Sequence, residues 1–445
     1  MSSARTAWLV VLGAALVGVG LLSSTTSTIN PSTLPSGFST VGPVESAALY
    51  CTGLTSAKGG ARGRVILLNT TDSSRSLTVN VVSDTGKSYS TTMKIAPMAS
   101  QSIDPSAVLS GNDFAVAAQV SGGGVVGEEV TRSTTGLAPC VSTAVADWYA
   151  AGFDTKVGSS ANLSIYNPTA TPAVLNVSTY SKSGFVAPAT FQGISVGAHV
   201  QFELNLGNQI VNTANVGVRV RVVRGTLDIV GVQQSGSTTS FNAGLAGPST
   251  TAQFPRVTTA RDTTVQVRLA NPGDKTALVT LDVALPPYHV APLKLAVPAY
   301  ASGFVSITPN PAIPAAGYAT VQLTSTVPVI AALAAGRLSD VAITSPGTPG
   351  LQFLLSSVLG ARFNAATVTN TSARSITLHF YDLQSRATSS TELAGATTED
   401  LSSVYRAAVS GRNVLVTSSR PVLLVTLTLP SKPVGVIVVA PLDGR

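Results

Sequence analysis

Residues 64–82 have the sequence RVILLNTTDSSRSLTVNVV. An apolar segment stands before Asn69, and an alternation of apolar and polar residues follows it, which is typical of β-strands with one buried face. Asn69 is followed by threonines and a short polar stretch, and this chemistry favours a tight turn. The stretch therefore predicts two β-strands joined by a turn at Asn69.

The same unit occurs three more times along the chain. Asn167, Asn271 and Asn370 take the place of Asn69, and the spacings between successive asparagines are 98, 104 and 99 residues. A repeat of this length predicts a chain built from four copies of one structural unit. The other three copies are NLSIYNPTATPAVLNVSTY (162–180), VQVRLANPGDKTALVTLDV (265–283) and AATVTNTSARSITLHFYD (365–382).

Two further landmarks keep the same register in all four copies. An aromatic residue precedes each asparagine by 17–19 positions, and a second pair of alternating segments follows it after about 45 residues, which predicts a second hairpin. The aromatic residues are Tyr50, Trp148, Phe254 and Phe353, and the second pairs cover residues 114–130, 216–232, 318–333 and 413–427.

The length of the repeat selects the fold class. About 100 residues of short antiparallel strands is the size of an immunoglobulin-like sandwich, whereas a propeller blade has about half that length. The sequence therefore predicts an all-β fold of four tandem immunoglobulin-like β-sandwiches. Their boundaries are expected at residues 46–141, 142–247, 248–347 and 348–445.

The amino terminus has the features of a targeting segment. Arg5 precedes an uncharged apolar run at residues 7–22, so we expect residues 1–22 to be a signal anchor, with a cleaved signal peptide as the alternative. Residues 23–45 are rich in Ser, Thr and Pro and predict a linker. Both alternatives place the rest of the chain outside the cytoplasm, secreted or anchored to the membrane by its N-terminus.

The two cysteines of the chain bracket the first predicted sandwich. Cys51 stands beside its first aromatic residue and Cys140 at its end. In an extracytoplasmic protein such a pair predicts a disulfide. Closing a loop of about 90 residues would stabilise the folded state by about 4 kcal/mol in the chain-entropy model.

The sequence shows no motif of catalysis or of cofactor binding. The three histidines fall in three different repeats, and no nucleophile-elbow, zinc-protease or P-loop pattern occurs. We therefore expect no enzyme, no cofactor and no metal. The net charge of +7 is spread thinly over the repeats, which argues against a nucleic-acid partner.

A ligand-binding surface is predicted on one strand of the second repeat. Arg219 and Arg221 alternate with valines in residues 218–222, so the valines should face the core and the arginines the solvent. We expect Arg268 to be similar, and Tyr149 to be an exposed aromatic residue beside a core Trp148. Such a surface could bind an anionic cell-wall polymer, and an envelope protein is the other candidate partner.

Two other functions stay open. A glycan hydrolase of the envelope would need two carboxylates from different sandwiches to meet in a cleft, with Asp147, Asp154, Glu128 and Glu129 as candidates. Because neighbouring residues of a strand point to opposite faces, at least one of Glu128 and Glu129 should face solvent. An accessory subunit of an envelope transporter or glycosyltransferase would share every feature of a binding module.

Two short motifs carry a resemblance to a known family. Residues 136–140 (GLAPC) and 147–152 (DWYAAG), together with the N-terminal segment, the linker and the Val/Thr-rich repeats, resemble a family of actinobacterial envelope proteins whose domain has no known function. The resemblance implies a secreted or membrane-anchored protein and brings no catalytic residues. The leading prediction is a non-enzymatic scaffold or binding module of the cell envelope.

Overall fold

The structure is a computed structural model of the whole chain. The predicted signal anchor and linker lie outside the residues it describes. No helix within the described part is long and apolar enough to cross a membrane. The described residues are 47–55, 63–131, 137–141, 144–337, 340–344, 346, 350–355, 363–370, 372–382, 385, 387–395, 397–401, 414–428 and 436–438.

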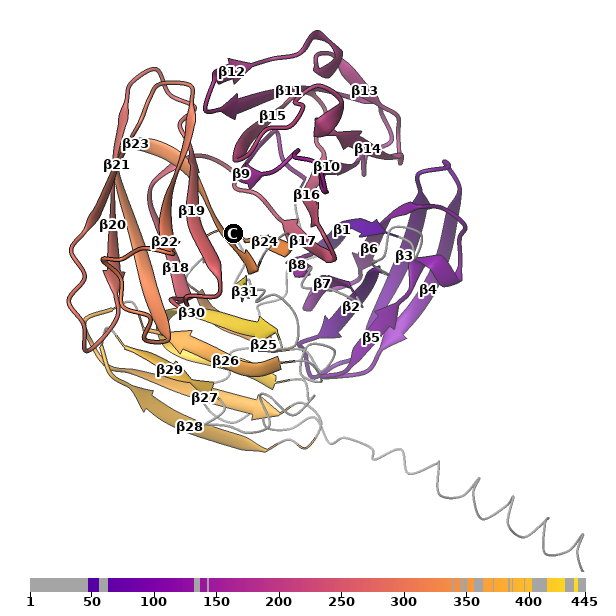
Figure 1. Cartoon of the computed structure of the whole chain (residues 1–445). Coiled ribbons are helices and arrows are strands. Elements are labelled where there is room, and N and C mark those ends of the chain that lie inside the picture. Colours follow the sequence, from indigo (N-terminus) through magenta and orange to yellow (C-terminus); the bar gives the residue numbers. More distant parts are fainter. Residues whose placement is uncertain are drawn as a thin grey trace, which may run out of the picture. The chain divides into compact units, whose positions relative to one another are not determined.

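The described residues form an all-β fold, which confirms that part of the prediction, and their strands form six sheets. Among the described strands, no sheet combines strands from distant parts of the chain. The strands therefore fall into four consecutive groups: strand group 1 (β1–β8), strand group 2 (β9–β17), strand group 3 (β18–β24) and strand group 4 (β25–β31) (Figure 1).

Strand group 1 has two four-stranded sheets, ordered β1-β6-β3-β4 and β5-β2-β7-β8. One hydrophobic cluster takes side chains from both sheets, including Val79 and Val116 of the first and Val65 and Leu67 of the second. The elements are β1 (Ala47–Thr55), β2 (Gly63–Asn69), β3 (Arg75–Ser83), β4 (Ser88–Ile95), β5 (Ser100–Ile103), the 3-10 turn η2 (Pro105–Ala107), β6 (Asp113–Val120), β7 (Val125–Thr131) and β8 (Leu137–Pro139).

Strand group 2 repeats this order with the sheets β9-β15-β11-β12 and β14-β10-β16-β17, and β13 pairs with β11. Its core again takes side chains from both sheets. The elements are β9 (Asp147–Phe153), β10 (Ser159–Tyr166), β11 (Ala173–Ser181), β12 (Gly184–Val186), η3 (Ala189–Phe191), β13 (Ile194–Val196), β14 (Gln201–Asn205), η4 (Leu206–Asn208), β15 (Val216–Arg224), β16 (Asp228–Ser235) and β17 (Thr238–Asn242).

Strand groups 3 and 4 each contain one long strand whose two halves pair with different sets of strands. The first part of β23 pairs with β18 and β20 and its second part with β19 and β24, and β30 pairs in the same way with β25, β27, β26 and β31. The strands of group 3 are β18 (Ser249–Thr258), β19 (Thr264–Ala270), β20 (Ala277–Ala284), β21 (Leu293–Val297), β22 (Ser302–Thr308), β23 (Tyr318–Arg337) and β24 (Asp340–Thr344). Those of group 4 are β25 (Gly350–Leu355), β26 (Phe363–Thr369), β27 (Ile376–Asp382), β28 (Thr388–Leu393), β29 (Thr398–Asp400), β30 (Val414–Thr428) and β31 (Val436–Val438).

The predicted hairpins are wrong, although the strands themselves are present. β2 and β3 flank Asn69 but belong to different sheets, and so do β6 and β7, which the sequence suggested as a second hairpin. In groups 3 and 4 the second hairpin is replaced by the continuous strands β23 and β30. Alternation shows which face of a strand is buried but not which strand pairs with it, so hydropathy cannot separate a hairpin from a crossing between sheets.

Each repeated asparagine is a buried hydrogen-bonding centre at such a crossing. The Nδ2 of Asn167 donates to the carbonyl oxygens of Thr171 (2.8 Å), Val196 (3.0 Å) and Gly197 (2.9 Å), and its Oδ1 accepts from the backbone N–H of Thr169 (2.9 Å). The side chains of Asn69, Asn271 and Asn370 make the corresponding bonds, and all four asparagines are fully buried.

The repeated aromatic residues fill the cores of three strand groups. Trp148, Phe254 and Phe353 are buried in the cores of groups 2, 3 and 4, whereas Tyr50 lies outside the core of group 1. In group 1, Cys51 takes the equivalent buried position. It stands opposite a core valine of β6, just as the three buried aromatic residues stand opposite core valines of β15, β23 and β30.

The predicted disulfide is present. Cys51 and Cys140 are bonded to each other, with their Cα atoms 4.5 Å apart, and they are 89 positions apart in sequence. The disulfide links β1 to Cys140, the residue that follows β8. The backbone N–H of Cys140 donates to the carbonyl oxygen of Gly127 on β7, so Cys140 belongs to the second sheet. The disulfide therefore joins the two sheets of strand group 1.

Candidate functional site

The two arginines of β15 lie on the outer face of the β9-β15-β11 sheet. Val218 and Val220 are fully buried in the core of strand group 2, so the alternation of the strand turns Arg219 and Arg221 away from it. Arg219 is half-buried, whereas Arg221 is exposed. On this face Arg221 stands opposite Asp147 of β9 in the strand register.

Arg219 is held by an acidic and two aromatic side chains. Its Nη2 lies 3.0 Å from Oδ1 of Asp147, and its guanidinium carbon lies 5.4 Å from the ring centre of Tyr149. Burial alone would lower the pKa of Arg219, but the Asp147 carboxylate together with Tyr149 and Tyr180 raises it above its ordinary value. Arg219 therefore stays charged and has a fixed position beside Arg221.

Tyr149 is not the exposed residue that the sequence suggested. It is 9 % exposed and packs with Tyr180 against side chains of strand group 3, among them Ala332 and Ile343. Alternation correctly placed Trp148 in the core and Tyr149 on the outer face. The prediction failed because strand group 3 covers that part of the outer face.

An aromatic series continues from this face to strand group 3. The ring of Phe185 lies 5.6 Å from that of Tyr180 and 6.2 Å from that of Tyr300. Phe185 and Tyr300 are 48 % and 45 % exposed. The sequence analysis missed these two residues, because both lie outside the repeated landmarks and their proximity depends on contacts between strand groups.

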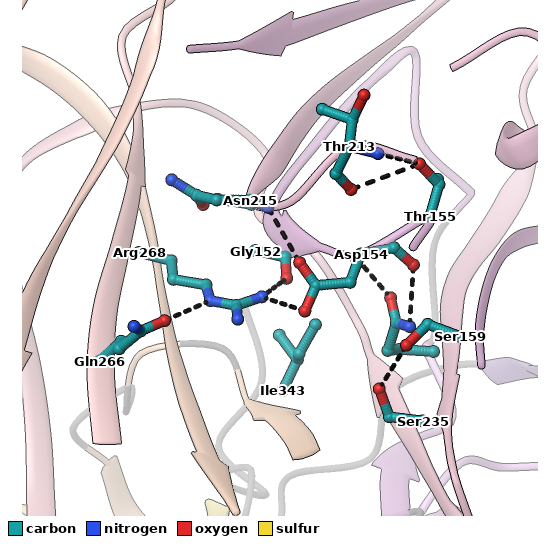
Figure 2. Close-up of polar contacts among 12 residues, drawn as sticks. Gly152, Asp154, Thr155, Ser159, Thr213, Asn215, Ser235, Gln266, Arg268 and Ile343 are labelled. Atoms are coloured by element: carbon teal, nitrogen blue, oxygen red, sulfur yellow. Dashed lines mark hydrogen bonds and ion pairs between the residues drawn. The ribbon is translucent and has the colours of Figure 1, made fainter. Parts of the chain in front are cut away.

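Arg268 is also not on a solvent face, contrary to the prediction. It is 7 % exposed, and its Nη1 lies 2.8 Å from Oδ2 of Asp154 and donates to the carbonyl oxygen of Gly152 at 2.7 Å. Figure 2 shows its guanidinium between Gln266 on its own strand and these two residues of strand group 2. Arg268 thus joins two strand groups, and its burial leaves it unsuited to bind a ligand from solvent.

The Asp154 carboxylate is fixed from a second side as well. Its Oδ1 accepts the backbone N–H of Asn215 at 2.9 Å, and the Asn215 side chain donates to the carbonyl oxygen of Gly303 in strand group 3 at 2.7 Å. A buried ion pair with its remaining hydrogen-bonding capacity satisfied is the arrangement that a protein interior tolerates. Asp154 and Arg268 therefore form a structural contact.

The carboxyl groups considered for a hydrolase lie at separate places. Asp147 pairs with Arg219, Asp154 pairs with Arg268, and Glu128 and Glu129 are both buried, so the expectation that one of them faces solvent is wrong. Asp147 and Asp154 thus pair with different arginines, and among the residues that the structure describes no group of three His, Cys, Asp or Glu side chains could hold a metal ion.

The family comparison covers more than half of the chain. Residues 132–403 match the model of a family described as "Family of unknown function (DUF5719)". The chain belongs to this family. Membership in the DUF5719 family confirms the resemblance to a family of unknown function, while the actinobacterial origin and the envelope location stay predictions.

Comparisons with individual proteins add little to the family assignment. A search of curated proteins gives no match. One solved structure, described as "Crystal structure of tetra-tandem repeat in extending region of large adhesion protein", has 10 % sequence identity and a TM-score of 0.13, with 92 % of this chain and 97 % of that chain covered. At this TM-score the similarity carries no argument about the DUF5719 protein.

Proposed function

We propose that this chain is a non-enzymatic, extracytoplasmic protein of the cell envelope that binds an anionic cell-wall polymer. In this proposal residues 1–22 anchor it to the membrane or direct its secretion, and residues 23–45 form a linker. The four strand groups are tandem immunoglobulin-like β-sandwiches that act as a scaffold for the binding surface. Support comes from the repeated strand order, the disulfide and the outer face of β15.

The observation that carries the proposal is the cationic outer face of β15. Arg221 is exposed, Arg224 follows it at the end of the strand, and Arg219 is fixed beside them by Asp147 and Tyr149. Guanidinium groups bind carboxylates and phosphates through two parallel hydrogen bonds. A row of such groups suits a polymer with repeated negative charges better than a small neutral ligand.

The aromatic residues beside this face support a polymer as the ligand. Phe185 and Tyr300 are exposed, and their rings continue the series from Tyr180. Exposed aromatic rings bind the apolar faces of ligands with little loss of side-chain entropy. The polymer would thus meet charges on β15 and apolar rings at the neighbouring contact between strand groups 2 and 3.

Co-sedimentation of the full chain with isolated cell walls tests the proposal. We expect binding that falls with added salt and disappears after the anionic polymers are stripped from the walls. Arg221→Glu should weaken binding, whereas Lys294→Glu, an equal charge change on exposed β21, should not. Binding that survives stripping, or is lost equally in both variants, would refute polymer recognition by β15. No binding to either wall preparation would instead favour an envelope protein partner, to be sought by crosslinking.

A further inference from the structure

The contact between strand groups 1 and 2 contains apolar side chains and carboxyl groups. Tyr50 and Tyr166 face each other with their ring centres 6.4 Å apart, and Tyr166 packs on Val82, Ala115 and Ala117 of group 1. A second apolar cluster brings Ala138 of β8 against residues of β16 and β17. These clusters stabilise the contact, and four carboxyl groups lie beside them.

The first two of these carboxyl groups meet at β1. Asp228 begins β16, is almost fully buried, and accepts a hydrogen bond of 2.5 Å from the hydroxyl of Thr52 across the contact. Glu129 on β7 is 0 % exposed, and neither of its carboxyl oxygens has a hydrogen-bond partner. An ionised carboxylate without a partner is strongly disfavoured in such surroundings.

The direction of the Glu129 side chain follows from its strand register. It stands opposite Val65, a core residue of β2, so it points to the core side of its sheet. There β1 has a bulge at Gly53, and a Cβ at that glycine would lie 3.5 Å from Oε1 of Glu129 and 3.2 Å from Cγ1 of Val230. Glu129 is therefore enclosed by both strand groups near Asp228.

The other two carboxyl groups are Asp113 at the start of β6 and Glu203 on β14. Their carboxyl groups lie close together where β6 packs on β14, and the side chain of Asn162 lies beside Glu203. Because like charges repel, two carboxyl groups at one site favour a state in which at least one carries a proton. The negative charge of Asp84 lies close to this pair as well.

No positive charge compensates these four groups in the described structure. None of the ion pairs among the described residues involves Asp113, Glu129, Glu203 or Asp228. Among the described residues, the titratable groups that act on them are Tyr50 and Tyr166 at Asp228 and Asp84 at the second pair, while Lys87, in the turn after β3, donates to the hydroxyl of Ser110.

The pKa values of these groups agree with the geometry. Burial raises the pKa of Asp228 to about 7, against the effect of its hydrogen bond to Thr52. Burial and the neighbouring Asp113 raise the pKa of Glu203 to about 9. Burial also raises the pKa of Asp113, and burial together with Asp228 raises that of Glu129 well above its usual value.

We infer that strand groups 1 and 2 dock through protonated carboxyl groups, so that loss of these protons opens the contact between them. The site is a proton-binding interface built from Asp113 and Glu129 of group 1 and Glu203 and Asp228 of group 2. It is independent of the proposed polymer binding, which uses the outer face of β15.

The direction of the effect follows from linkage. Each group has a higher pKa in the docked state than in water, so docking is strongest below the ordinary pKa values near 4 and weakens as the pH rises toward the docked values. Each titrating group weakens docking about tenfold per pH unit over its window. For Asp228 the window runs from about pH 4 to about pH 7, so its contribution to docking is lost as the pH rises through this range.

Distance measurements by electron spin resonance on the full chain test this inference. Spin labels at Ser90→Cys on β4 and Ser195→Cys on β13 occupy exposed positions in the two strand groups. We expect one narrow distance distribution at pH 4.5 and a second population that grows as the pH rises toward 9. The isosteric variant Asp228→Asn/Glu203→Gln should reduce this pH dependence by orders of magnitude, whereas Asp282→Asn, at an exposed position of β20, should leave it unchanged.

Two results would overturn the inference. One is a wild-type distribution that is the same from pH 4.5 to pH 9. The other is an opening that persists unchanged in the Asp228→Asn/Glu203→Gln variant, because the protons would then bind elsewhere. Polymer binding that remains intact while the distances change with pH would leave the proposed function untouched.

Discussion

Replacing Asn167 by alanine should strongly destabilise strand group 2. The side chain donates to three backbone carbonyl oxygens, at Thr171, Val196 and Gly197, and accepts from the backbone N–H and the hydroxyl of Thr169. It thereby joins the crossing between β10 and β11 to the end of β13. Alanine would remove all of these bonds and leave their backbone partners buried without replacement.

The magnitude can be worked out from the number of bonds. The two N–H hydrogens of the amide serve three carbonyl oxygens, so they are counted as two hydrogen bonds, and the amide oxygen accepts two more. This makes four hydrogen bonds at about 1 kcal/mol each. We therefore expect Asn167→Ala to lower the free energy of unfolding by about 4 kcal/mol, a large part of the 5–15 kcal/mol typical of a folded domain. Asn167→Asp should be at least as destabilising at neutral pH, because a carboxylate would face carbonyl oxygens.

Tryptophan fluorescence during urea unfolding measures this change in one strand group. Trp148 lies in the core of strand group 2, and the other tryptophan of the chain, Trp8, lies in the N-terminal segment. With a slope of about 1–3 kcal/mol per molar urea for a unit of this size, the midpoint should fall by at least about 1 M. Asn208→Ala, at an exposed position, is the matched control. The hydrogen-bond argument is refuted if Asn167→Ala shifts the midpoint no more than Asn208→Ala.

Three further predictions concern the disulfide and the contact between strand groups 2 and 3. The double substitution Cys51→Ala/Cys140→Ala should destabilise strand group 1 by about 4 kcal/mol, because an 89-residue loop is no longer closed, and hydrogen exchange in β1–β8 should rise. Arg268→Met should cost about 3–5 kcal/mol by leaving Asp154 buried without its cation, and Asp154→Asn in the same chain should restore part of the loss in thermal unfolding. Gly217→Ala should lower the free energy of unfolding by about 1–3 kcal/mol, and with it the thermal midpoint, because the new Cβ would lie 2.3 Å from the Cβ of Ala270 in group 3. Trp148 fluorescence should still report a folded core.

The sequence predicted the local structure well, for reasons visible in the strands. Alternation at Val218 and Val220 correctly separated core valines from outer arginines, since one face of each strand is buried in its own strand group. The repeated asparagines marked real structural positions. Their burial was missed, because turn propensity alone does not distinguish an exposed turn from a buried crossing between sheets.

The failed predictions share a different cause. Tyr149 and Arg268 were assigned from the pattern of a single repeat, and contacts with another strand group decide the surroundings of both. Such contacts join residues more than 100 positions apart, as Arg268 and Asp154 show. Periodicity within one strand carries no information about a neighbour of that kind, so the candidate site was the least predictable part of the molecule.

The two contacts of strand group 2 differ in how they compensate buried charge. Toward group 3, the Asp154 carboxylate meets the Arg268 guanidinium, and a guanidinium keeps its charge over the whole physiological pH range. Toward group 1, Glu129 and Asp228 meet no cation in the described structure. A rise in pH should therefore act on the contact with group 1 and spare the contact with group 3. The cationic face of β15 and its aromatic neighbours in group 3 would then stay together while strand group 1 separates, so polymer binding and domain opening can be measured independently in one molecule.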